Sequence, residues 1–486
     1  MTTPERSEKL GIWTKIGFGL GDIYGGGASM IISFYYLHFL TDVVRINPTL
    51  AGTAFLISKI YDAVTDPFEG VLTDRTRTPM GRRRPYLLGG IILVFLSFFL
   101  MWYPVNYASE SGRFIYTIAT YLFFSTTVSI VMISYNALAS ELTLDYNERT
   151  SLSSIRIFFS SFSSILAAVI PLEIVKWFPN DIRTGYTVMA LCFGIFYALP
   201  FLATFFATKE RPEFQKKPKP FNLRQTFIAP FKVRSFVSVL LMYLMSFVAM
   251  DTVSSIVIYF MKYYIGKGSI TNYVNGALLI TQVASIPFYV YLSKKTSKRT
   301  SFLVGCAVWM FSLFFSFLLG PSSPTWTLYA FAVAVGAGTG GIVVMIYAMF
   351  PDIPDIDELQ SGERREGTYS SITSFMRKFS SAIALFLVSN ALTLSGYVQP
   401  IEEVVNGVQK IVEQAQTPQF ILFLRLLFIF GPIFFLIFAI IFALRYPLTA
   451  SIHARLNEIL EKNRKGVALS TAEQQEADYL KHLLIG

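Results

Sequence analysis

The sequence predicts an all-α membrane protein in which twelve transmembrane helices form two pseudo-symmetric halves of six. Composition is the first observation: 53% of the 486 residues are hydrophobic and 15% are charged, with 46 Phe and 26 Tyr. A soluble protein of this length needs far fewer apolar residues. The second observation is that apolar stretches of about 20 residues or more, each enough to cross about 30 Å of hydrocarbon as a helix, recur along the whole chain.

The apolar stretches follow one another with short connections. The first is too long and too rich in glycine for a cleavable signal peptide, so it is expected to remain as a helix. The predicted spans cover residues 12–42, 48–73, 85–106, 113–142, 150–178, 184–208, 230–265, 271–293, 300–320, 325–350, 367–397 and 418–446.

A polar, proline-containing interruption after the sixth span divides the chain into two halves. We expect an N-terminal half over 1–208, a cytoplasmic linker over 209–229, a C-terminal half over 230–446 and a cytoplasmic helical tail over 447–486. In the tail, Ser470 is followed three residues later by Glu473, which is the pattern of a capping box at the start of a helix. This tail suits either simple packing on the cytoplasmic face or a regulatory docking role.

The net charge of +10 is explained by topology. Basic residues gather in alternate loops, such as Arg82–Arg84 after the second span and Lys294–Lys295 after the eighth, so they do not form the single basic face of a nucleic-acid-binding protein. Loops rich in Lys and Arg stay in the cytoplasm. We therefore expect a multi-pass protein of the inner or plasma membrane with both termini cytoplasmic. Cys192 and Cys306 lie within apolar spans and are read as packing residues.

Two carboxylates stand out because they lie inside an apolar span. Asp62 and Asp66 are one helical turn apart, so both project from the same face and can converge on one cation. Hard cations prefer oxygen ligands, and two neighbouring carboxylates also favour proton binding, so Na⁺, Li⁺ and H⁺ are all open. The alternative is a structural ion pair with Lys59 or with a basic residue of another helix. Lys378, in the eleventh span, is deep enough to reach the pair.

A second charged pair is predicted between the first and fifth spans. Asp22 lies in a glycine-rich segment that allows close approach of a helix or ligand, and its carboxylate could accept hydroxyl groups of a sugar. Arg156 is its natural counter-charge and could donate a fork of hydrogen bonds. A plain structural ion pair remains the alternative. Arg377 and Lys378 are adjacent and point about 100° apart on a helix, so at most one should face a central cavity squarely.

The loop after the second span carries a further constellation. Asp74, Arg75, Gly81 and Arg82 suit a tight, charge-paired cytoplasmic loop that helps hold one conformation, although a simple topology signal would explain the charges too. The loop resembles the signature loop of major facilitators. Two halves of six helices joined by a cytoplasmic linker are also the architecture of that class, which binds substrate between the halves.

The chain resembles the glycoside-pentoside-hexuronide:cation symporters, the melibiose permease family, over nearly all of residues 10–446. The resemblance rests on five segments in order. They are Gly17-Phe-Gly-Leu-Gly-Asp22, Tyr61-Asp62-Ala-Val-Thr-Asp66-Pro67, Gly81-Arg-Arg-Arg-Pro85, Glu141-Leu-Thr-Leu-Asp145-Tyr-Asn-Glu148-Arg149, and Asp352-Ile-Pro-Asp355 through Gly362-Glu-Arg-Arg-Glu-Gly367.

What the resemblance implies is a cation site and a substrate site. The cation site uses Asp62, Asp66, Thr65 and the hydroxyl of Ser129. The substrate site uses Asp22 and Arg156, and we assign Lys378 and Asn136 to it as well. The chain departs from the family pattern at Gly21, Met132 and Asn136, which puts galactoside specificity in doubt and leaves the cargo open.

We therefore predict a secondary active symporter that imports a sugar or glycoside with Na⁺, Li⁺ or H⁺ by alternating access. A cation-coupled carrier of an amphipathic lipid or organic anion is the alternative, because the resemblance also extends to a related animal branch of this family, which carries lysophospholipids. We expect no enzyme activity, since the spans contain no catalytic motif or cofactor fingerprint. The expected partners are the cargo, a monovalent cation and membrane lipids, with no nucleic acid and no cofactor, and the functional unit is expected to be a monomer.

Overall fold

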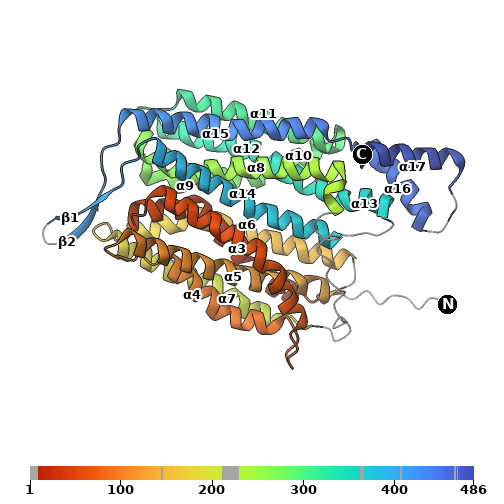
Figure 1. Ribbon diagram of the computed structural model, residues 1–486, viewed down its shortest axis with the longest axis horizontal. Coiled ribbons are helices and arrows are strands. Elements are labelled where there is room, and N and C mark those ends of the chain that lie inside the picture. Colours follow the sequence, from red (N-terminus) through yellow and green to blue (C-terminus); the bar gives the residue numbers. More distant parts are fainter. Residues whose placement is uncertain are drawn as a thin grey trace.

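The computed structural model describes residues 9–143, 146–210, 229–361, 366–405, 408–464, 467 and 469–485. Its helices run nearly parallel to one long axis and form two groups (Figure 1). The helices of the first half, coloured red to yellow, lie below those of the second half, coloured green to blue. The loops alternate between the end of the molecule that carries the hairpin β1–β2 and the end that carries α16 and α17. We call these the hairpin end and the tail end.

The first half contains the spans before the linker. Its elements are α1 (Ile12–Leu20), α2 (Asp22–Ile31), η1 (Ile32–Tyr36), η2 (Phe39–Val43), α3 (Pro48–Arg75), α4 (Arg84–Trp102), α5 (Glu110–Leu142), α6 (Tyr146–Lys176) and α7 (Ile182–Ala207). The first predicted span is therefore a broken helix with two π-helical turns. The predicted linker lies almost wholly outside the described residues.

The second half and the tail contain the remaining elements. They are η5 (Ala229–Lys232), α8 (Arg234–Tyr259), η6 (Phe260–Tyr264), η7 (Gly268–Ile270), α9 (Thr271–Ala284), α10 (Ile286–Lys295), α11 (Lys298–Phe315), η8 (Ser316–Leu318), α12 (Thr325–Met349), η9 (Phe350–Asp352), α13 (Ile353–Ser361), α14 (Glu366–Leu394), β1 (Ile401–Val405), β2 (Val408–Val412), α15 (Pro418–Arg445), α16 (Ala450–Arg464) and α17 (Thr471–Leu484).

The described helices agree with a twelve-span bundle. Ten helical segments among the described residues are long and apolar enough to cross a membrane. The other two predicted spans correspond to α1–η2, which is interrupted, and to α3. Helix α3 is long enough, at 28 residues, but its charged side chains lower its hydropathy. The charged residues of α3 include Lys59 and Glu69 as well as the predicted cation ligands Asp62 and Asp66.

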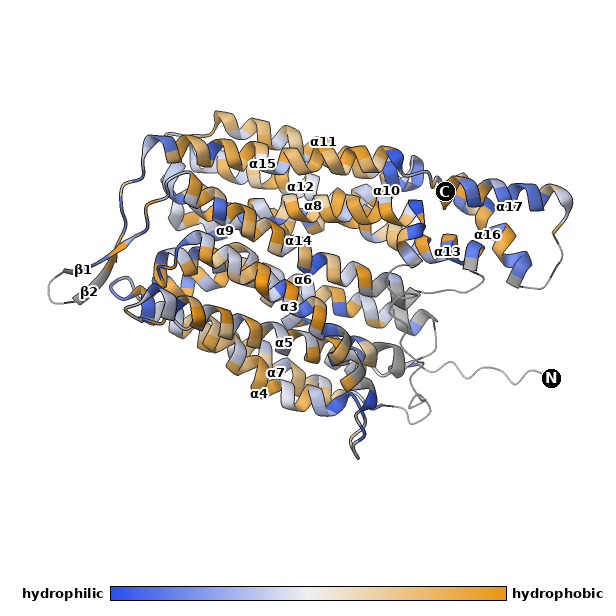
Figure 2. Ribbon diagram, viewed as in Figure 1, coloured by the Kyte–Doolittle hydropathy of each residue, from blue (hydrophilic) through white to orange (hydrophobic). Residues whose placement is uncertain are grey.

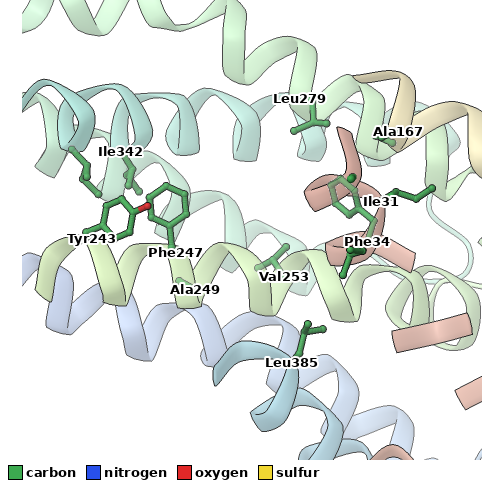
Figure 3. Close-up of a cluster of buried hydrophobic side chains, with 14 of the residues drawn as sticks. Ile31, Phe34, Ala167, Tyr243, Phe247, Ala249, Val253, Leu279, Ile342 and Leu385 are labelled. Atoms are coloured by element: carbon green, nitrogen blue, oxygen red, sulfur yellow. The ribbon is translucent and has the colours of Figure 1, made fainter. Parts of the chain in front are cut away.

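The apolar residues explain how the helices pack. Hydrophobic residues predominate along the helices of the bundle, whereas hydrophilic residues are frequent in the tail helices α16 and α17 (Figure 2). Part of the buried core crosses between the halves, since Ile31 and Phe34 of the first half lie near Val253 and Leu279 of the second (Figure 3). Glycine allows close approach of helices inside the first half: a Cβ on Gly26 of α2 would lie 2.5 Å from a backbone oxygen of α6.

Two further features lie outside the bundle. The capping box predicted in the tail is confirmed at the start of α17, where Ser470 and Glu473 hydrogen-bond reciprocally. The end of α17 docks on α8, because the Arg234 amide donates to the Ile485 carbonyl at 3.1 Å. The hairpin β1–β2 was not predicted. It forms in the acidic loop before the last span, where Ile401 pairs with Val412 in an antiparallel register.

Candidate functional site: a central cavity beside a carboxylate cluster

A cavity of about 750 Å³ lies between the two halves. Its walls come from α2, α5 and α6 on one side and from α8, α12, η9, α13 and α14 on the other. This volume is in the range of about 300–1,000 Å³ found for small-molecule sites. The charged residues on the wall are Asp22, Arg156 and Arg377, and hydroxyl groups come from Ser29, Ser160, Tyr243, Tyr347, Thr373 and Ser374, among others.

The predicted pair between the first and fifth spans is present on the cavity wall. The Arg156 guanidinium donates to both carboxylate oxygens of Asp22, with Nε to Oδ2 at 3.1 Å and Nη2 to Oδ1 at 3.3 Å. Asp22 is buried, while the Arg156 side chain is 30% exposed. Arg156 also lies over the ring of Tyr135, 5.2 Å from its centroid. The arginine is therefore held in one orientation with part of its guanidinium open to the cavity.

The second half contributes a matching pair that the sequence analysis did not identify. Arg377 of α14 donates to Asp251 of α8 from both terminal nitrogens, at 2.6 and 3.0 Å. Asp251 is buried, and the Arg377 side chain is 31% exposed and lines the cavity. Phe247 packs under the guanidinium with its ring centroid 4.7 Å away. The two halves thus each present one arginine that a buried carboxylate orients.

The Asp62 carboxylate, which is the first predicted cation ligand, is buried and accepts several hydrogen bonds. Asp62 is 1% exposed. Lys59 Nζ lies 2.7 Å from its Oδ2, and the Ser125 hydroxyl of α5 lies 2.7 Å from both of its oxygens. The pairing with Lys59 was one of the alternatives that the sequence left open, and in this conformation it is formed.

Lys378 lies against both predicted cation ligands. Its ammonium is 2.8 Å from the nearer oxygen of Asp66 and 3.9 Å from Asp62, and it donates to the Ser129 hydroxyl at 2.7 Å. A positive charge therefore already stands beside Asp66, Asp62 and Ser129, where the resemblance places the coupling cation. Because Arg377 and Lys378 are adjacent on α14, the Arg377 side chain faces the cavity and the Lys378 side chain faces this cluster.

The other predicted residues lie further from these contacts. Thr65 donates its hydroxyl to the Tyr61 carbonyl one turn earlier in α3, at 3.1 Å. Asn136 is exposed on α5 and is not among the residues that line the cavity, whereas Met132, one turn earlier, does line it. The assignments of Lys378 and Asn136 to the substrate site remain predictions. The geometry brings Lys378 to the predicted cation ligands instead.

Glu69 is a charged residue of this region that the sequence analysis missed. It lies one turn after Asp66 on the same face of α3 and is 7% exposed. Its Oε2 is buried without a hydrogen-bond partner. The signal was present in the sequence, since positions 62, 66 and 69 follow the spacing of one helical face.

The charged loop at the tail end is organised by an acidic residue that lies far away in sequence. Gly81 has φ +112°, in the left-handed region that favours glycine. The backbone amides of Arg82, Arg83 and Arg84 all donate to the Glu210 carboxylate, at 2.7–2.8 Å. Arg75 is exposed, and the side chain of Asp74 lies outside what the structure describes. The expected tight loop is therefore present, and Glu210 is the anion that it surrounds.

Contacts between the halves close the hairpin end. The Asp42 carboxylate at the end of the first span accepts from Lys262 Nζ at 2.9 Å, from Tyr263 at 3.1 Å and from Tyr397 at 2.5 Å, all of the second half. Nearby, Glu402 of the hairpin pairs with both Arg45 and Arg183 of the first half. Asp42 is 3% exposed. The cavity extends in the other direction, to Phe350, Pro351 and Pro354 at the tail end.

Comparisons with known proteins give the family and the fold. A family model described as MFS/sugar transport protein matches residues 17–450. The isoprimeverose transporter of Lactiplantibacillus pentosus is 27% identical over 79% of this chain and 80% of its own length. A putative glycoside/cation symporter of Escherichia coli K12 is 28% identical over 80% and 85% of the two chains. A solved bacterial homologue of the human drug peptide transporters PepT1 and PepT2 is 12% identical and matches the fold with a TM-score of 0.60, covering 90% of this chain and 98% of its own.

Proposed function

Because the chain belongs to the MFS/sugar transport family, we propose that it is a secondary active symporter that imports a sugar or glycoside with Na⁺, Li⁺ or H⁺ by alternating access. The observation that supports this proposal is that neighbouring residues of α14 belong to the cavity and to the carboxylate pair. Arg377 lines the cavity, and the next residue, Lys378, contacts the carboxylate pair. Cargo and cation can therefore influence each other through one helix.

The cavity favours a neutral, hydroxyl-rich cargo. Both arginines on its wall are already paired with buried carboxylates, so the wall carries no net charge. An anionic cargo could contact the open part of either guanidinium, but it would bring a negative charge that these two arginines, each already neutralised by its own aspartate, do not balance. Serine, threonine and tyrosine hydroxyls supply the remaining polar groups. This lining supports a glycoside over the alternative cargo of an amphipathic lipid or organic anion.

The cation site is proposed to lie between Asp62 and Asp66. In the present conformation the Lys378 ammonium supplies positive charge there, so a bound cation requires Lys378 to withdraw. The cation promotes transport only if it binds the cargo-competent state more tightly than the other state, and the cargo must then raise the cation affinity by the same factor. We propose that the cation replaces Lys378 beside the aspartates, and that α14 transmits this change to the cavity.

The conformation is proposed to be inward-facing. The basic loops lie at the tail end, which the charge rule for membrane proteins places in the cytoplasm with both termini. The Asp42 contacts close the opposite end, and the cavity extends toward the tail end. We propose that the chain works as a monomer without a cofactor, because the cargo cavity and the carboxylates lie within one chain.

The test measures ligand-induced thermal stabilisation of the purified protein. A panel of neutral glycosides, glucuronides and lysophospholipids is added with NaCl or with choline chloride at equal ionic strength. A ligand that binds the folded state raises the melting temperature by mass action. We expect a neutral glycoside to stabilise the protein more strongly with Na⁺, Li⁺ or lowered pH than without, and Asp66→Asn to abolish that difference. Stabilisation by lysophospholipid alone would refute the sugar assignment.

A further inference from the structure

Glu69 extends the carboxylate cluster by one residue that the cation site does not yet use. Asp62, Asp66 and Glu69 project from one face of α3 because they are four and three residues apart. Glu69 is close enough to Asp66, Lys378 and Asp62 to interact electrostatically with all three. It is nine-tenths buried, and its Oε2 has no hydrogen-bond partner.

When Asp62, Asp66 and Glu69 are all ionised, the charges of the cluster do not balance without an additional cation. Lys59 pairs with Asp62 and Lys378 pairs with Asp66. While Lys378 remains in place, these two pairs are neutral together and do not attract a cation from solution. Glu69 adds a third carboxylate, so two positive charges face three negative ones. One net negative charge remains, which one monovalent cation neutralises.

Among the residues that the structure describes, Lys378 is the cation whose charge acts on Glu69. Helix α3 packs against α5 and α14. Toward the cluster, α5 presents the hydroxyls of Ser125 and Ser129, and α14 presents Lys378. Arg83, beyond the next turn, directs its guanidinium to the Thr73 hydroxyl at 2.9 Å. Among the described residues, no three acidic, histidine or cysteine side chains converge as a metal cage, so Glu69 acts through its charge and does not serve as a third ligand.

We propose that Glu69 supplies the negative charge that the coupling cation neutralises, while Asp62 and Asp66 supply the oxygen ligands. This inference rests on the proposed function. A buried unpaired charge is costly in a membrane protein, and the arriving cation removes that cost. Glu69 is therefore a positioning residue for the cation: it makes the cluster attractive to one monovalent ion even though both aspartates already have lysine partners.

The experiment uses the purified full-length protein and the cations alone. The melting temperature is measured against NaCl and LiCl, with choline chloride maintaining ionic strength, and against lowered pH. Glu69→Gln and Glu69→Met are two neutral variants, so that one remains usable if the other does not fold. Glu403→Gln is the control, because it removes an exposed carboxylate of β1 at the hairpin end. Asp66→Asn tests the ligand assignment separately.

We expect the neutral Glu69 variants to need at least about tenfold more of whichever cation stabilises the wild type, with Glu403→Gln unchanged. A response that persists in Glu69→Gln but disappears in Asp66→Asn would overturn the role of Glu69 and leave the cation site standing. A response that persists in both would overturn the cation site itself. A wild-type protein that responds to none of the three cations would overturn both proposals.

Discussion

Replacing Asp42 by Asn should open the hairpin end. The Asp42 carboxylate accepts hydrogen bonds from Lys262, Tyr263 and Tyr397 of the opposite half, and the amide of asparagine cannot accept all three or balance the lysine charge. Lys262, whose side chain is 17% exposed, would lose its closest carboxylate partner. We therefore expect the equilibrium to move away from the conformation in which the halves meet at this end.

The size of the shift follows from the contacts. Removing one partner of a buried ion pair costs about 3–5 kcal/mol, and each hydrogen bond to a charged group contributes about 1.5–3 kcal/mol. Glu413 also pairs with Lys262, at 3.0 Å, and compensates for part of this loss. A net shift of about 1.4 kcal/mol or more changes the population ratio by about tenfold or more.

The assay measures access to the cavity from the hairpin side. Ser29, which lines the cavity, is replaced by cysteine in a chain whose own two cysteines, Cys192 and Cys306, are changed to serine. A membrane-impermeant maleimide is then added outside right-side-out vesicles. We expect Asp42→Asn to raise the labelling rate by about tenfold or more, and Glu413→Gln to raise it less. Equal rates in Asp42→Asn and its parent would show that this carboxylate does not hold the hairpin end closed.

Three further substitutions test separate parts of the structure. Arg377→Lys removes the pair of hydrogen bonds that the guanidinium makes with Asp251. It should weaken binding of the stabilising glycoside by about tenfold or more, since hydrogen bonds to charged groups are worth about 1.5–3 kcal/mol. The Na⁺ response without glycoside serves as the control. Gly81→Ala forces a non-glycine residue to φ +112° and should destabilise the protein by about 1–3 kcal/mol. Gly89→Ala is the control: no atom lies within 4 Å of the added Cβ and alanine is favoured over glycine inside a helix, so it should not lower the melting temperature. Hydrogen bonding from Lys462 lowers the pKa of Glu473 from 4.5 to about 2. The ionised Glu473 therefore stabilises α17 above about pH 4.5, and this stabilisation is lost as the pH falls toward 2. Hydrogen exchange of the amides in the first turn of α17 should follow this loss in the wild type and not in Glu473→Gln.

The sequence was sufficient for the bundle and for part of the site. Apolar length determines a transmembrane helix almost by itself, because every backbone polar group in lipid must be satisfied within the segment. The proximity of Asp62 to Asp66 follows from helical spacing, and the opposite charges of Asp22 and Arg156 identify them as partners once the helices pack. The capping box of the tail is likewise a local pattern.

The remaining contacts depend on helix rotation and on distant chain segments. Arg377 and Lys378 are adjacent cations, and only the rotation of α14 decides that the first meets the cavity and the second meets Asp66. Ser125 and Ser129 are one turn apart on α5, yet Ser125 contacts Asp62 and Ser129 contacts Lys378. The order of residue types in the sequence does not indicate in which direction these side chains point.

Glu210 could not be predicted for a different reason. Its partners are backbone amides of the Arg82–Arg84 segment, and every residue except proline carries a backbone amide. No side-chain pattern therefore marks the binding partner, although the glycine at position 81 signals the turn. Unlike Glu210, Glu69 had a readable signal, because its spacing from Asp66 places it on the face that carries the charged pair.

The hairpin makes the closed end sensitive to ionic strength. Glu402 links β1 to Arg45 and Arg183 across the two halves, and these side chains are 18–21% exposed. Dissolved ions screen partly exposed charges, with a Debye length of about 8 Å at 0.15 M and about 3 Å at 1 M. Concentrated salt of any composition should therefore weaken this link between the halves, whereas the buried Asp42 contacts should resist it. Ionic strength therefore acts on the opening of this end, at a place separate from the carboxylates of α3 where the cation site is proposed.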